Sequence, residues 1–186
     1  MKNTIKYLVG FIRCILKRLK YSSRVYIGKD VKITNPKNVF LASSVQIRPY
    51  VDIFTSHFVV GENTDIGTRN RFDGKVVIGE NVILGPDNYI SSIDHIYDNI
   101  SVPIQFAGAR YINKNGHNGV LSIGDDSWIG THCAIIGDVK IGKHCVIGAN
   151  SVVTKDVPDY SVVVGNPAKI IKKYNLEKKK WEVIEG

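Results

Sequence analysis

The histidines of this sequence are the side chains best suited to proton transfer at neutral pH. An ordinary imidazole has a pKa near ~6.5, so it can accept a proton from a reacting hydroxyl. Among the five histidines, His95 is distinguished by its place in the segment ISSIDHIYDN, where a regular pattern in the sequence stops. His95 is therefore the leading candidate for proton transfer. The alternative is an exposed histidine in a loop.

The pattern that stops near His95 is a six-residue repeat of apolar side chains. It forms three runs, from Ile27 to Val51, from Val60 to Ile90 and from Ile123 to Val153. The runs hold 17 positions, all aliphatic except Phe72, and nine of them are followed directly by Gly. A period of six fits neither an α-helix nor a strand that alternates simply between two faces.

A solenoid of short strands joined by bends accounts for this period. One apolar residue of each strand would point inward, and the glycines would permit the turns. With three strands in each coil, residues 18 apart stack at the usual strand spacing of ~4.8 Å. The 17 positions then make somewhat under six coils. We predict a mainly β domain whose core needs neither metal nor disulfide.

The repeat is interrupted twice. Val51 and Val60 are nine residues apart, so we expect three extra residues, Ser56–Phe58, to bulge from a corner. A larger break lies between Ile90 and Ile123. Its sequence contains Pro, Gly and Asn but no hexads, which predicts an extruded loop over about residues 96–121.

His95 would stand on a rigid coil at the root of this loop. Loops of this length in compact domains are usually functional or disordered, and rigid coils on both sides favour function over a tolerated insertion. Asp94 falls at an inward position of its hexad, where a buried charge is costly, so we expect the coil to be distorted there. Neighbours on a strand point to opposite sides, so Asp94 either supports the site or has only a structural role.

Composition narrows the class of protein. A chain of 186 residues with 44% hydrophobic residues fits one globular domain better than a disordered or membrane-spanning chain. The net charge of +8 suits phosphates, nucleic acid or a lipid surface, but no basic-aromatic stacking motif supports nucleic-acid binding, so we expect none. Three cysteines without paired spacing suit a reducing, cytoplasmic compartment, and Cys133 and Cys145 are expected to be packing residues.

Three segments add to the hexads: DSWIGTHCAI, VIGANSVVTKDVP and VVGNPAKIIKK. With them, the sequence from Ile27 to about Lys172 resembles the hexapeptide-repeat acyltransferases, especially the maltose and galactoside acetyltransferases and the capsule and lipopolysaccharide O-acetyltransferases. The resemblance implies a left-handed parallel β-helix and a homotrimer with acetyl-CoA as cosubstrate. It also implies that His95 deprotonates the acceptor hydroxyl, and that Asn70 contacts the acceptor sugar.

The same resemblance places coenzyme A along one track. Thr131 and Ala149 match positions that line the coenzyme groove through backbone groups. Their separation of 18 residues independently stacks them on one face. The alternative is a pair of ordinary small residues in a coil.

Further residues match the family's coenzyme contacts near the end of the repeat. They are Thr154 and Lys155, together with Lys169 and Lys172, which fall where the family often has arginines for the nucleotide phosphates. Lysine supplies charge without the bidentate fork of arginine. Each lysine is alternatively a solvated surface charge. The β-helical carbonic anhydrases need three metal histidines, two of them five positions apart, and no such pair occurs here, so we expect no metal.

The two ends differ from the repeat. We divide the chain into an N-terminal amphipathic helix or cap (residues 1–24), a β-helix domain (25–168) and a tail with a closing strand and short helix (169–186). Charges interrupt the N-terminal apolar run, so we expect no signal peptide. Its helix either covers the open first coil or lies on an anionic membrane surface. Its apolar positions recur at helical spacing: Ile5, Leu8, Val9, Ile12, Ile15, Leu16 and Leu19.

These observations predict an acetyl-CoA-dependent O-acetyltransferase that acts on a sugar hydroxyl of a surface polysaccharide or its precursor. It would be cytoplasmic, with possible peripheral contact at the inner face of the membrane. One alternative is N-acetylation of an amino sugar, which also needs a base. Another is a noncatalytic β-helical binding protein, which would need neither His95 nor a coenzyme track.

Overall fold

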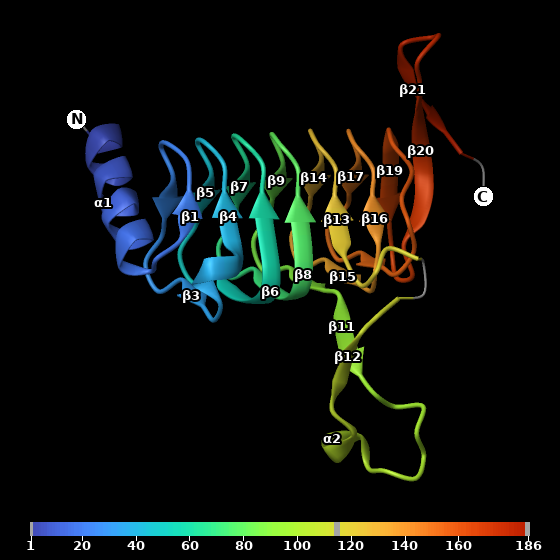
Figure 1. The fold of residues 1–186 in the computed structure, drawn as a ribbon. Helices are drawn as coiled ribbons and strands as arrows, with labels where there is room; N and C mark the ends of the chain where they lie inside the picture. The colour runs from blue at the N-terminus through green and yellow to red at the C-terminus, as the bar shows by residue number, and fades with distance from the viewer. Residues whose placement is uncertain (1, 114–115, 185–186) are drawn as a thin grey trace.

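The chain is wound into a parallel β-solenoid of about seven turns in the computed structural model, which describes residues 2–113 and 116–184 (Figure 1). Helix α1 (Lys2–Leu16) lies at one end of the solenoid, and an antiparallel hairpin of β20 (Lys169–Asn175) and β21 (Lys180–Val183) lies at the other. An arm projects from the flank between them; it contains β11 (Ile93–His95), α2 (Ile104–Ala107) and β12 (Ala109–Tyr111). The mainly β solenoid predicted from the hexads is confirmed.

Two sheets carry the coils. In one sheet, seven parallel strands follow one another in space: β2 (Tyr26–Ile27), β5 (Gln46–Ile47), β7 (Asp65–Ile66), β9 (Ile83–Leu84), β14 (Trp128–Ile129), β17 (Val146–Ile147) and β19 (Ser161–Val164). The other sheet contains β1 (Lys20–Tyr21), β3 (Lys32–Ile33), β4 (Val39–Leu41), β6 (Asp52–Val60), β8 (Arg71–Ile78), β10 (Tyr89–Ser91), β13 (Leu121–Ile123), β15 (Ala134–Ile136), β16 (Lys140–Ile141) and β18 (Val152–Val153).

The predicted stacking is also confirmed. Ile129 in β14 is the Cα partner of Ile147 in β17, 18 residues later. Sixteen of the 17 repeat positions are buried, and Ile33 is partly buried. There are about seven turns rather than somewhat under six, because winding already includes β1, before the first run of hexads, and continues through Val163 on β19, beyond the last run.

The glycines of the repeat have a different role from the one expected. A Cβ atom at Gly61 would lie 2.5 Å from the carbonyl carbon of Gly79, so these glycines let successive coils approach closely. The left-handed corner residue stands two positions later, as in Asn63 (φ 57°) and Asp126 (φ 58°). Asn and Asp tolerate this conformation better than other side-chain-bearing residues, which explains their place at the corners.

The predicted bulge at Ser56–Phe58 is wrong in extent. Strand β6 runs through all three residues with a single register irregularity between Thr55 and His57, and Phe58 is fully buried. The other two extra residues are absorbed earlier, between Ile33 and Leu41, where the short 3₁₀ helix η1 (Pro36–Asn38) intervenes. The apolar repeat did not reveal these two extra residues, because Val39 and Leu41 are both apolar and both buried, and Val39 alone kept the six-residue spacing.

Both ends correct an expectation. The described tail residues form the β20–β21 hairpin in place of the short helix we predicted. Helix α1 does lie against the first coil, but with the opposite face from the one expected. Gly10 and Cys14 are buried against the coil, whereas Ile12 and its apolar neighbours are exposed.

Candidate active site

The arm that carries His95 begins where β10 ends. Strand β11 (Ile93–His95) leaves the coil and pairs antiparallel with β12 (Ala109–Tyr111), and the short helix α2 (Ile104–Ala107) lies near the tip (Figure 1). His95 is the register partner of Ala109. It therefore stands at the base of an extruded hairpin, and the expectation that it lies on a rigid coil is wrong.

Asp94 is exposed, not turned inward. The chain leaves the interior just after Ser92, which is fully buried and whose Oγ accepts a hydrogen bond from the backbone N–H of Lys75 (2.8 Å). A carboxylate oxygen of Asp94 accepts a hydrogen bond from the backbone N–H of His95 (2.8 Å). Asp94 thus fixes the local backbone at His95 without burying its charge.

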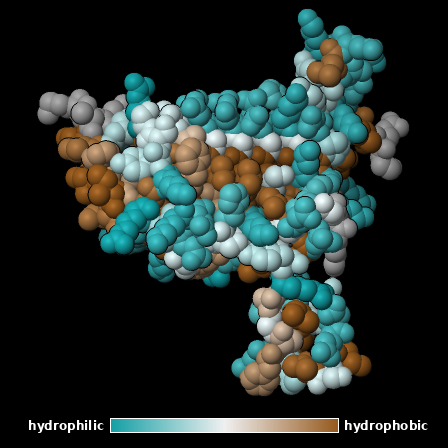
Figure 2. Space-filling model, viewed as in Figure 1, coloured by the Kyte–Doolittle hydropathy of each residue, from teal (hydrophilic) through white to brown (hydrophobic). Residues whose placement is uncertain are grey.

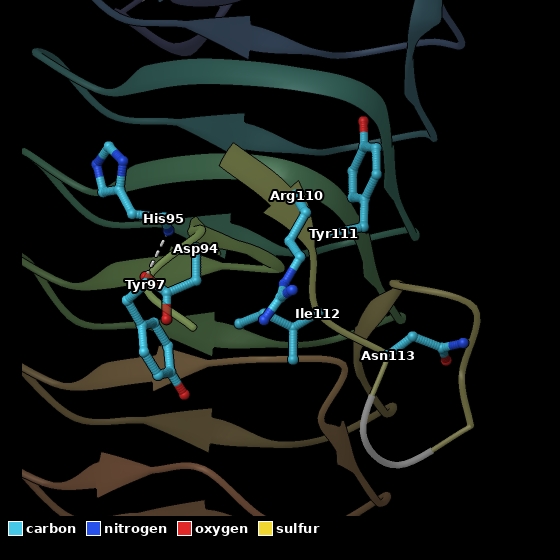
Figure 3. Close-up of a pocket in the computed structure, with 7 residues that line it drawn as sticks. All are labelled: Asp94, His95, Tyr97, Arg110, Tyr111, Ile112 and Asn113. Carbon is cyan, nitrogen blue, oxygen red and sulfur yellow. Dashed lines mark hydrogen bonds between the residues drawn. The ribbon is translucent and has the colours of Figure 1, made fainter. Parts of the chain in front are cut away.

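A cavity of about 270 Å³ opens beside this strand. Figure 3 shows its lining, with the imidazole of His95 pointing away from the phenol ring of Tyr97. The lining contains a carboxylate, an imidazole, a guanidinium, an amide and two phenols, which together can both donate and accept hydrogen bonds. The lining residues are Asp94, His95, Tyr97, Arg110, Tyr111, Ile112 and Asn113.

The base of the arm is held to the coils by several contacts. The hydroxyls of Tyr111 and Ser56 lie 2.6 Å apart, and the ammonium of Lys75 lies 4.5 Å from the centre of the Tyr111 ring. The backbone N–H of Ile112 donates to the carbonyl of Ser92 (2.9 Å). These contacts fix the cavity relative to the solenoid, although the arm itself extends outward.

Sequence reasoning did not find four of the cavity's polar residues: Tyr97, Arg110, Tyr111 and Asn113. They belong to the segment without hexads, where no periodicity indicates a direction for a side chain. Arg110 is held by Asp98, whose carboxylate accepts two hydrogen bonds from its guanidinium (3.2 and 2.6 Å) and raises its pKa. The guanidinium is therefore a fixed cation at the edge of the cavity.

Asn70 lies elsewhere. It is 1% exposed, and its Nδ2 donates to the carbonyls of Gly67 and Gly85 at 2.8 Å each. Its Oδ1 accepts from the backbone N–H of Asn88 (3.0 Å). Because this amide is enclosed and bonded to neighbouring coils, the geometry does not support the predicted contact with an acceptor.

Thr131 and Ala149 do stack in neighbouring coils. The carbonyl of Thr131 accepts a hydrogen bond from the backbone N–H of Asn150 (2.9 Å), which joins the two corners. The Thr131 hydroxyl donates to the carbonyl of Pro86 (2.9 Å), while Ala149 is exposed. The corner thus presents a small exposed side chain beside an anchored one, where a thin ligand can approach the backbone.

A second cavity, of about 230 Å³, lies at the C-terminal end of the solenoid. Its lining includes Thr154, Lys155 and Lys169, three of the residues predicted to contact the coenzyme. Lys172 does not line it and lies exposed on β20 opposite Val162. This cavity and the cavity of His95 share no lining residue.

Cys133 and Cys145 are buried in the coil interior, and burial raises the pKa of both thiols. The Sγ of Cys133 donates to the carbonyl of Gly148 (3.2 Å). These contacts confirm that both are packing residues. Within residues 2–113 and 116–184, no three His, Cys, Asp or Glu side chains gather as metal ligands would.

Residues 122–155 match the family described as "Bacterial transferase hexapeptide (six repeats)". The chain is 32% identical to a solved maltose O-acetyltransferase of Clostridium difficile 630, covering 87% of this chain and 73% of that one with a TM-score of 0.54. The chain belongs to the hexapeptide-repeat acetyltransferase family. The resemblance on which the sequence analysis relied is confirmed.

Two curated relatives extend this comparison. The probable acetyltransferase Rv3034c of Mycobacterium tuberculosis is 31% identical over 95% of this chain and 59% of its own length. The putative lipopolysaccharide biosynthesis O-acetyl transferase WbbJ of Escherichia coli is 33% identical over 77% of this chain and 65% of its own. The chain therefore spans only 59% to 65% of the length of these relatives.

Proposed function

We propose that this member of the family is an acetyl-CoA-dependent O-acetyltransferase acting on a sugar hydroxyl of a surface polysaccharide or its precursor. The observation that carries the proposal is the polar cavity around His95, on the same chain as a corner track of small residues and a lysine-lined cavity. The printed names of its relatives, which include maltose and lipopolysaccharide O-acetyltransferases, support the choice of acceptor.

In this proposal His95 is the general base. Its imidazole nitrogen takes the proton of the acceptor hydroxyl while the oxygen attacks the thioester carbonyl carbon of acetyl-CoA. The new C–O bond forms, the C–S bond breaks, and coenzyme A leaves as a thiolate that regains the proton. Backbone amides hold the oxyanion of the tetrahedral intermediate. General-base assistance of this kind contributes about 10²–10⁴-fold.

The acceptor would be held by the groups around His95. Tyr97 and Tyr111 offer phenol surfaces on which a sugar ring can pack, and Asp94, Arg110 and Asn113 offer hydrogen bonds to hydroxyls. Acetylation of an amino sugar stays an alternative, since the carboxylate of Asp94 also suits an ammonium group.

The coenzyme would lie along the corner at Thr131 and Ala149, with its nucleotide end toward Lys155 and Lys169. Lys172, exposed on β20, would reach the phosphates only at the rim of the lysine-lined cavity. In a homotrimer the site would lie between subunits. Exposed Ile83 and Trp128, Cα partners on β9 and β14, form an apolar strip that suits contact between subunits. We place the enzyme in the cytoplasm, where acetyl-CoA is made.

Acetyl-CoA turnover should be measured against a panel of sugars and amino sugars, with the His95→Asn variant beside the wild type. We expect kcat/KM to fall by about 10²–10⁴-fold in His95→Asn, because the base is lost. His144→Asn is a matched control: His144 is exposed, has a φ of 52°, and asparagine tolerates that conformation. Unchanged turnover in His95→Asn would contradict the mechanism, and transfer to amino groups alone would change the acceptor class.

A further inference from the structure

Helix α1 turns its apolar face away from the protein. Seven large apolar side chains of this helix are between 36% and 76% exposed: Ile5, Leu8, Val9, Phe11, Ile12, Ile15 and Leu16. Figure 2 shows the resulting hydrophobic area over α1 at one end of the molecule. Exposed apolar areas of this kind mark contact surfaces for proteins or membranes.

The opposite face of α1 accounts for how the helix is attached. Gly10 and Cys14 are buried, and the Gly10 backbone lies directly against the carbonyl of Val25. Lys6 Nζ donates to the Gln46 side chain (2.5 Å), and Arg13 donates to the carbonyl of Ile27 (2.6 Å). Since the helix is anchored by this face, its apolar face is available to a different partner.

Charge indicates what that partner is. The first 29 residues contain no Asp or Glu, and their basic residues are Lys2, Lys6, Arg13, Lys17, Arg18, Lys20, Arg24 and Lys29. A cavity of about 360 Å³ between α1 and the first coil is lined by Arg13, Lys17 and Lys32, with Asp30 the one carboxylate in the lining. Two copies of this end would bring like charges together, whereas anionic headgroups would complement them.

We infer that α1 lies in the interface of an anionic phospholipid bilayer, with its apolar face among the acyl chains and the cations that follow it (Lys17, Arg18 and Lys20) at the phosphate level. The helix has 15 residues, a length of about 22 Å at 1.5 Å per residue, which is shorter than the ~30 Å hydrocarbon core. No helix of the described chain has the length and apolarity to cross a membrane. The inference does not depend on the proposed acetyl transfer.

Co-sedimentation of the full chain with vesicles tests this directly. We expect binding to vesicles of phosphatidylglycerol and phosphatidylcholine, little binding to phosphatidylcholine alone, and weaker binding as salt rises. Leu8→Glu with Ile12→Glu should reduce binding by at least about tenfold, because two charges would enter the apolar layer. Leu176→Glu with Val183→Glu is the matched control, since both residues are exposed in the hairpin at the other end of the solenoid.

A second measurement tests the inference even if the Leu8→Glu, Ile12→Glu variant folds poorly. An environment-sensitive dye on Ile12→Cys should shift to the blue when phosphatidylglycerol vesicles are added, whereas the same dye on Leu176→Cys should not. The native cysteines are buried and should not be labelled. A dye at position 12 that does not respond, or equal binding by the Leu8/Ile12 variant, overturns the inference. If the wild type does not bind vesicles and the Leu8/Ile12 variant forms a smaller oligomer than the wild type, the apolar face of α1 is instead an interface between copies of the chain.

Discussion

At the scale of single residues, polar side chains inside the coils bind the next coil. Thr64 is fully buried, donates to the carbonyl of Gly79 (2.8 Å) and accepts from the backbone N–H of Val82 (3.1 Å). Ser127 makes the equivalent bonds to Gly142 and Cys145 (3.0 Å each). Asn70 and Asn88 form a second inward column, also two positions before the large apolar residue, in which Asn70 bonds to Asn88 and Asn88 to Cys133. These side chains make the hydrogen bonds that water would otherwise make to backbone groups left unpaired by the short strands.

This column predicts that Asn70 contributes to stability and not to acceptor binding. Asn70→Ala leaves the N–H of Asn88 and the carbonyl of Gly67 without their side-chain partner, while the carbonyl of Gly85 keeps only its bond from Asn88 Nδ2. We expect the free energy of unfolding to fall by about 2–4 kcal/mol in urea denaturation, because several buried polar groups lose hydrogen bonds. Asn99→Ala, at an exposed position in the arm, should change it by less than about 0.5 kcal/mol. A variant with normal stability and a raised KM for the acceptor would restore the original prediction.

The difference between Asn70 and His95 shows what residue types reveal. The family resemblance assigned both residues to the acceptor site. His95 lies at the end of a repeat, and a break in periodicity is visible in the sequence. Asn70 lies within an unbroken repeat, where the inward position accepts Val, Thr, Asn, Ser or Cys, so sequence alone did not separate a coil-binding amide from a ligand-binding one.

At the scale of elements, the hexads predicted the coils, and their break predicted where a segment projects, but not the structure within that segment. A buried side chain in each hexad fixes strand direction, and that information is absent from the arm, where Ile100 is 98% exposed. The hairpin pairing of β11 with β12 depends on backbone bonds that leave no apolar period. The orientation of α1 was missed for a related reason. The helical spacing of its apolar residues indicated an apolar face, but the close contact at Gly10 and Cys14 determines which face packs.

The attachment of α1 can be tested at Gly10. A Cβ at this position would overlap the carbonyl of Val25, so Gly10→Ala should detach the helix although alanine raises intrinsic helix propensity by about 1 kcal/mol. Alkylation of Cys14 reports detachment, since burial raises the pKa of this thiol to about 11. We expect Cys14 to react at least about 100-fold faster at pH 8 in the variant, because a free thiol has a pKa near ~8.5. Val9→Ala, on the exposed side, should leave the rate unchanged.

The same thiol sets the sign of a pH effect. The folded pKa of Cys14 lies above that of an exposed thiol, so its contribution to docking is complete below about pH 8.5 and is lost as the pH rises toward 11. The alkylation rate of Cys14 in the wild type should therefore rise more steeply with pH than thiolate formation alone predicts, because loss of docking also exposes the thiol. A rate that follows a single free thiol at every pH would show that α1 is not docked in solution.

At the scale of the whole molecule, the straight stacking of coils keeps the candidate site in two pieces. The cavity of His95 is built on the arm, and the lysine-lined cavity lies at the C-terminal corner, without a shared residue. An arm that projects from the flank reaches outward from its own solenoid (Figure 1). In a cyclic trimer, the arm of one subunit would lie against the corner of the next, and the two pieces would form three complete sites.

Mixed trimers test this arrangement, because shared sites can be rebuilt from two defective chains. His95→Asn removes the base and Ala149→Trp obstructs the coenzyme track, so each homotrimer should be nearly inactive. In a random equal mixture, about a quarter of the sites pair an intact His95 with an intact neighbouring track, and we expect about a quarter of wild-type turnover. A mixture of wild type with the double variant controls for mixing, since it should retain about a quarter of turnover if sites are shared but about half if each site lies within one chain. Recovery near zero in the first mixture and near half in the second would place the whole site in a single subunit, and the arm would then have to fold back on its own coils.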